Sequence, residues 1–103
     1  MRLTKEQHRA IRRAAAQAFG ETARVRLFGS RVDDSARGGD FDLYAKTEET
    51  DPDRLESARR AFLQRLHAEP CLEDEPIDVV IHSPLHTDER AIDQVAREEG
   101  VAL

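Results

Sequence analysis

The sequence has little of several residue types that mark secreted or membrane-inserted proteins. Cys71 is the only cysteine among 103 residues, which excludes an internal disulfide framework and is consistent with a reducing compartment. No apolar run approaches the length of a membrane span, and the charged N-terminus lacks an apolar signal region. Tryptophan is absent and aromatic residues make up 5%. A chain of this length has room for one modest core, so we expect a single cytoplasmic domain over residues 1–103.

Charge, by contrast, is abundant. Charged residues make up 36% of the chain and the formal net charge is -5, so general affinity for nucleic acid is not expected. The basic pairs Arg12-Arg13 and Arg59-Arg60 are interpreted as solvated helix faces. A highly charged surface with few aromatic residues suits a protein that takes part in a complex.

Apolar residues at helical spacing predict three helices. The first is expected over Lys5–Phe19, because Thr4 and Gln7 have the form of a capping box and Gly20 is a natural stop. A second helix should begin at Asp51-Pro52 and end at Glu69-Pro70. A third should begin near residues 87–90 and end at Gly100.

Alternation and β-branched residues predict three strands. They are expected over Ala23–Phe28, Asp40–Ala45 and Pro76–Ile81. The apolar tail 101–103 is expected to pack back on the domain. The fold class is therefore α/β (α+β), with a small mixed sheet backed by helices, and Asp78 is a lone carboxylate within the apolar third strand.

The stretch that organises the chain is Leu27-Phe28-Gly29-Ser30-Arg31, followed after a short spacer by Gly38-Gly39-Asp40-Phe41-Asp42-Leu43. Residues two apart on a strand share a face, so Asp40 and Asp42 point the same way. Two adjacent carboxylates repel each other unless a cation lies between them, and Mg2+ prefers such oxygen ligands. At Gly29-Ser30, glycine lets a phosphate approach the backbone, and free N–H groups and a hydroxyl can bind it. A triphosphate and its metals would then share one site.

Gly-Ser followed by Gly-Asp-Phe-Asp-Leu resembles the signature of the polymerase-beta-like nucleotidyltransferase superfamily. The short chain is similar to its minimal nucleotidyltransferase (MNT) branch, whose members often serve as antitoxins to HEPN-domain ribonuclease toxins, and the resemblance covers most of the chain. It implies that the first two strands are neighbours and that the third lies beside the second. It also implies ATP as substrate, two Mg2+ ions and a third carboxylate, which the strand context assigns to Asp78.

The resemblance assigns a role to each motif residue. Asp40, Asp42 and Asp78 would be the catalytic and metal-binding residues, with Asp78 either holding the second metal or accepting the hydroxyl proton. Gly29 and Ser30 would hold the phosphates. Arg31 would assist Gly29 and Ser30 in binding the phosphates. Arg37 is also placed to reach phosphates, but the simpler interpretation of Arg37 is a mobile surface charge.

The leading function is an antitoxin enzyme that transfers AMP from ATP to a tyrosine of a cognate HEPN toxin, in a hetero-oligomer. Two alternatives stay open: a non-catalytic antitoxin that masks the toxin, and a stand-alone enzyme acting on a small-molecule hydroxyl. The absence of a second domain favours an acceptor delivered by a partner protein. Tyr44 lies on the carboxylate face of its strand. Transfer of AMP to Tyr44 itself is an alternative that has no support beyond this location.

Overall fold

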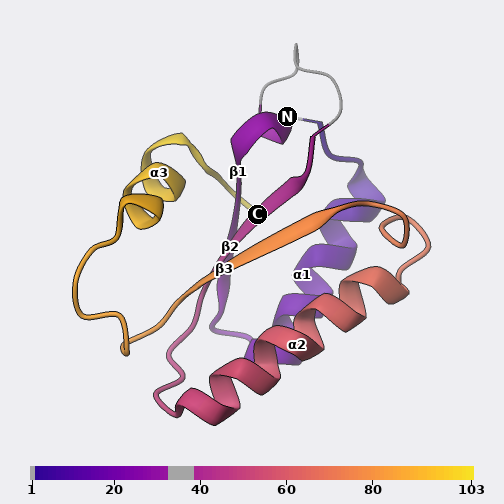
Figure 1. Cartoon of the computed structure of the whole chain (residues 1–103). Helices are drawn as coiled ribbons and strands as arrows, with labels where there is room; N and C mark the ends of the chain where they lie inside the picture. The colour runs from indigo at the N-terminus through magenta and orange to yellow at the C-terminus, as the bar shows by residue number, and fades with distance from the viewer. Residues whose placement is uncertain (1, 33–38) are drawn as a thin grey trace.

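The structure, a computed structural model, describes residues 2–32 and 39–103. Within these residues the chain forms three α-helices, one short 3-10 helix and a four-stranded sheet (Figure 1). In chain order the elements are α1 (Lys5–Phe19), β1 (Arg24–Phe28), η1 (Gly29–Val32), β2 (Phe41–Lys46), α2 (Pro52–Ala68), β3 (Ile77–His82), α3 (Ala91–Glu99) and β4 (Val101–Ala102). This confirms the expected small mixed sheet packed against helices. None of the described helices is long and apolar enough to pass through a bilayer.

The sheet has the strand order β3-β2-β1-β4. β1 pairs antiparallel with β2 and with β4, whereas β2 and β3 are parallel. α2 makes the crossover that a parallel pair requires. The order confirms the expected neighbours, with the second strand between the first and the third. The apolar tail, expected to pack back on the domain, adds the edge strand β4.

Helix ends follow the local signals in the sequence. The Gln7 backbone N–H donates to Thr4 Oγ1, and the Thr4 N–H donates to Gln7 Oε1, both at 3.0 Å. The predicted capping box of α1 is therefore confirmed. Asp51 caps α2 in the same way, since its side chain accepts from the Asp53 and Arg54 N–H groups.

The main core lies between one face of the sheet and the helices α1 and α2. Its fully buried large side chains include Ile11, Leu27, Phe41, Phe62 and Leu66. Phe41 and Leu43 point into this core, so alternation along β2 turns Asp42 and Tyr44 to the opposite face.

α3 covers part of that opposite face, which makes the domain locally three layers thick. Ala96 and Ile92 of α3 pack on Phe28, Tyr44 and Val80 in a second, smaller apolar cluster. α3 begins at Ala91 with Arg90 as its N-cap, at the end of the predicted start over residues 87–90. The Arg90 N–H donates to the Asp93 side chain and fixes the first turn there.

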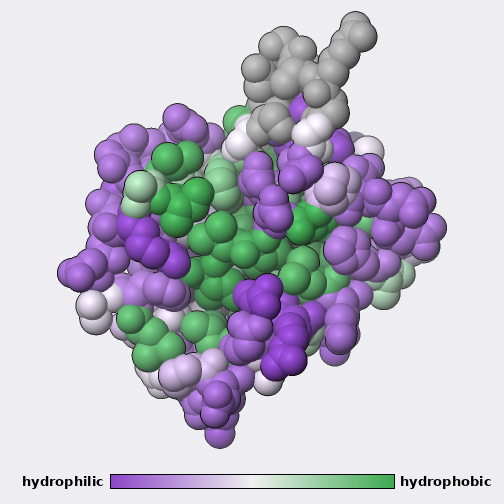
Figure 2. All heavy atoms as spheres, in the orientation of Figure 1, coloured by the Kyte–Doolittle hydropathy of each residue, from purple (hydrophilic) through white to green (hydrophobic). Residues whose placement is uncertain are grey.

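One surface of the molecule carries a concentration of apolar residues. Figure 2 shows hydrophobic residues gathered at the centre of the face that Figure 1 presents, over β3 and α3, with hydrophilic residues around them. β3 is an edge strand of this sheet, and Leu85 and Val95 are among the large hydrophobic residues left exposed. Apolar surface of this kind is typical of protein-binding faces.

Candidate functional site

Two of the predicted carboxylates lie side by side in the sheet. Asp42 of β2 is the register partner of Asp78 of β3, and on its other side it is paired with Phe28 of β1. Register partners share a face, and adjacent strands run about 4.8 Å apart. Asp40 comes immediately before β2 and is exposed. We refer to Asp40, Asp42 and Asp78 as the carboxylate cluster.

Gly29 brings the chain against the carboxylate of Asp42. Its φ of 78° is in the left-handed region, which glycine adopts without strain. A Cβ atom built on Gly29 would lie 2.2 Å from Asp42 Oδ2, so no larger residue fits without displacing that side chain. The predicted Gly-Ser turn and the predicted carboxylate therefore meet in space.

The electrostatics of the cluster are those of an unneutralised acidic site. The pKa of Asp42 is raised, first by burial and then by the negative charges of Asp78 and Asp40. Among the described residues, none of the three carboxylates has an ion-pair partner. Within residues 2–32 and 39–103, no positive charge therefore pairs with the cluster to stabilise its ionised form.

The donor set suits a hard divalent cation, because it offers only carboxylate oxygens. Asp42 with Asp78 and Asp40 could hold Mg2+. Burial, and after it the charges of Asp78 and Asp40, raise the pKa of Asp42, and a bound cation would oppose both effects. Within the described part of the chain, however, no three acidic, histidine or cysteine side chains already converge as a metal cage.

Arg31 contacts the core side of β2 and, within the described residues, makes no bond to the carboxylate cluster. Its guanidinium donates to Glu75 at 2.9 Å and to the Gly39 carbonyl, and it stacks 4.1 Å from the centre of the Phe41 ring. Phe41 is on the core face of β2, whereas Asp42 is on the other face. In this conformation Arg31 ties η1 to the segment before β3, a contact that sequence spacing alone does not reveal.

The remaining predicted residues are placed only in part. Ser30 lies in η1 directly after Gly29, at the end of β1. Arg37 and Gly38 lie outside the described residues, while Gly39, with a φ of 91°, precedes Asp40.

A buried polar network next to the site was not predicted. The Tyr44 hydroxyl donates to Asp93 Oδ1 at 2.7 Å, and Arg90 donates to both oxygens of Asp93 and to the Ile81 carbonyl. Burial and the bond to Asp93 raise the pKa of Tyr44 to about 12. Arg90 lies three residues before Asp93, a spacing at which helix-surface side chains interact, and this is the one signal that sequence offers.

Neither protein-family models nor curated proteins gave a match to this sequence. The geometry therefore carries the chemical argument. It places oxygen ligands for a divalent cation beside a glycine turn at the end of β1, an arrangement suited to chemistry on a metal-bound phosphate compound.

Proposed function

We propose that the protein is a Mg2+-dependent nucleotidyltransferase of the polymerase-beta-like type. The observation that carries this proposal is the side-by-side register of Asp42 and Asp78 next to Gly29. Asp78 is exposed on the edge strand β3, so a solvated surface carboxylate is the competing interpretation. Its register opposite Asp42 favours the site, since like charges directly opposite each other are destabilising without a cation.

Each residue has a specific task in this proposal. Asp40 and Asp42 hold the metal ions, and Asp78 either completes the second metal site or accepts a proton. The metal supplies charge neutralisation for the phosphates and a lowered pKa for the attacking hydroxyl. Gly29 and Ser30 offer backbone N–H groups to the phosphates.

The transfer step is a displacement at the α-phosphorus of ATP. The acceptor oxygen forms a bond to that phosphorus while the bond to the bridging oxygen of the β-phosphate breaks. Pyrophosphate leaves, and the hydroxyl proton passes to Asp78 or to water. AMP remains attached to the acceptor.

We propose a tyrosine of a cognate HEPN toxin as the acceptor. Tyr44 is poorly suited to this task, because it is 7% exposed and its hydroxyl is bonded to Asp93. The apolar surface over β3 and α3 supports a protein partner over a free small molecule (Figure 2). Steric masking of the toxin and small-molecule transfer are the competing outcomes.

The test is incubation of the protein with the product of the adjacent gene, labelled ATP and Mg2+, where that product carries the Arg-(four to six residues)-His motif of HEPN toxins. Label on a toxin tyrosine supports the proposal, and its loss in Asp42→Asn and Asp78→Asn shows that the carboxylate cluster is needed. Asp88→Asn is the matched control, because Asp88 is an exposed loop carboxylate. Toxin neutralisation without ATP, unchanged in Asp78→Asn, would instead establish masking.

A further inference from the structure

The face of the sheet that carries the carboxylate cluster has a second row of charged positions at its other end. Arg24 of β1 is the register partner of Lys46 of β2, and Lys46 is the register partner of His82 of β3. These three positions therefore share one face and lie across three adjacent strands, a width of about 10 Å. We call Arg24, Lys46 and His82 the cationic row. Lys46 is four positions along β2 from Asp42, so the two rows are about 13 Å apart.

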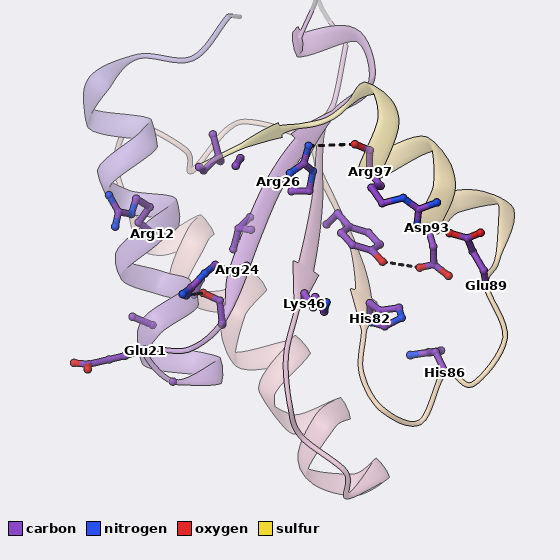
Figure 3. Close-up of a pocket in the computed structure, with 18 of the residues that line it drawn as sticks. Arg12, Glu21, Arg24, Arg26, Lys46, His82, His86, Glu89, Asp93 and Arg97 are labelled. Carbon is purple, nitrogen blue, oxygen red and sulfur yellow. Dashed lines mark hydrogen bonds and ion pairs between the residues drawn. The ribbon is translucent and has the colours of Figure 1, made fainter.

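A large cavity lies over the cationic row. Its volume is about 1010 Å³, at the upper end of the range of small-molecule sites. Figure 3 shows the row between α1 on one side and α3 on the other, with Arg26 above it and His86 beside it. Arg12 and Glu21 contribute from the α1 side.

Positive charge predominates among the side chains that line the cavity, although the whole chain is acidic. Two of the lining acids are already neutralised, because Glu89 pairs with Arg97 and Asp93 with Arg90. Glu21 remains as an opposing charge. Among the described residues, Arg12 and Lys46 have no ion-pair or hydrogen-bond partner, and Arg24 donates only to the exposed carbonyls of Thr22 and Ala23.

The register places two like charges next to each other when no anion is bound. Arg24 and Lys46 stand directly opposite each other, and like charges in that position destabilise a strand pair. One carboxylate would neutralise only one of them. Two permanent cations and an imidazole in one row suit a ligand with several closely spaced negative charges. The walls of α1 and α3 suit a small one, and Arg12 adds positive charge from the α1 side.

We propose that the cationic row binds a small ligand carrying two or more phosphoryl groups, at a site separate from the carboxylate cluster. Binding here needs no divalent cation, because protein side chains supply the positive charge. The site does not depend on the nucleotidyl transfer proposed above.

The test uses inorganic pyrophosphate as the probe and calorimetry in EDTA, which removes metal-dependent binding at the carboxylate cluster. We expect wild-type protein to bind it, and Lys46→Gln or Arg24→Gln to weaken binding about tenfold or more, the loss expected for one hydrogen bond to a charged group. Both residues are exposed at strand ends, and a thermal melt checks that each variant folds. Arg54→Gln, an exposed cation on α2, is the matched control and should bind as wild type does.

Three further arms locate and identify the ligand. Amide chemical-shift changes should cluster around Lys46 and His82, and Asp42→Asn should leave the affinity unchanged. ATP in EDTA should compete with pyrophosphate for the site. Such competition would show that the site recognises phosphoryl groups, whether they belong to a nucleotide or to free pyrophosphate. No binding in EDTA, equal loss in Arg54→Gln, or single-stranded RNA binding that pyrophosphate cannot displace would each overturn the proposal.

Discussion

Gly29 is the residue at which backbone conformation and candidate chemistry depend on each other. An L-residue in the left-handed region costs about 1–2 kcal/mol, and a Cβ here would also displace Asp42. We therefore expect Gly29→Ala to lower the free energy of unfolding by about 2 kcal/mol or more. AMP transfer per folded molecule should also fall, as urea unfolding and the labelled-ATP assay would measure.

Gly20 provides the control for this prediction. Its φ of 94° is also positive, but a Cβ there meets nothing within 4 Å. Gly20→Ala should therefore lose stability through backbone strain alone and keep its transfer activity. Equal losses of transfer activity in Gly29→Ala and Gly20→Ala would show that Gly29 has no specific role at the carboxylate cluster.

Asp42 and Asp78 allow a second test at the scale of single residues. Burial and neighbouring negative charges raise the pKa of Asp42, so its ionised form opposes folding when no metal is bound. In EDTA, Asp42→Asn and Asp78→Asn should each keep or increase the free energy of unfolding. The double variant should gain less than the sum, because each substitution relieves the same repulsion.

Urea unfolding of the four proteins in this double-mutant cycle measures the coupling. A clear loss of stability in Asp78→Asn, with transfer per folded molecule preserved, would assign Asp78 a structural role. The site would then consist of Asp40 and Asp42 alone.

At the scale of elements, α3 is held to the sheet by Asp93. This carboxylate is 4% exposed and accepts bonds from Tyr44 and Arg90. Asp93→Asn should lower the free energy of unfolding by about 2 kcal/mol, because donors around a buried acceptor lose their partner. Tyr44→Phe, which removes one hydrogen bond, should cost about 1 kcal/mol.

The same carboxylate predicts how acid affects the fold. Hydrogen bonds from Arg90 are the largest cause that holds the pKa of Asp93 well below its usual range. The contribution of ionised Asp93 to the free energy of unfolding is complete above the unfolded-state pKa, about 4. It is lost as the pH falls toward the lower pKa of the folded state. Wild type should therefore lose stability between about pH 4 and pH 2, and Asp93→Asn should lose less over that range. Identical acid profiles in urea titrations would contradict this account.

The elements show which features a sequence can predict. Thr4 with Gln7 and Asp51 with Pro52 are local signals, and the helices begin where these signals predict. Asp40 and Asp42 were placed on one face because strand alternation is also local. The contact of Arg31 with Glu75, the bond between Tyr44 and Asp93, and the cationic row depend on register and packing between distant segments, which no local pattern determines.

At the scale of the whole molecule, charge is distributed unequally over one sheet face. The carboxylate cluster lies at one end and the cationic row lies at the other, and α3 packs on Phe28 and Tyr44 of the same face. The two ends of this sheet face thus have opposite electrostatic environments. Salt should act differently on the two ends, because it screens repulsion among the acids and competes with anions at the cations.

The net charge of -5 and the carboxylate cluster together predict a response to ionic strength. In EDTA, raising NaCl from about 0.02 to about 0.5 M should increase the free energy of unfolding, because screening weakens repulsion between like charges. Loss of exposed ion pairs such as Arg13–Glu69 offsets little of this gain. The increase should be smaller in the double variant Asp42→Asn/Asp78→Asn than in Asp74→Asn/Asp88→Asn, which makes the same change in net charge at exposed positions. Urea unfolding across the salt series measures how the free energy of unfolding depends on NaCl in each double variant. An equally reduced dependence in the two variants would show that overall charge sets the response, with no special contribution from the carboxylate cluster.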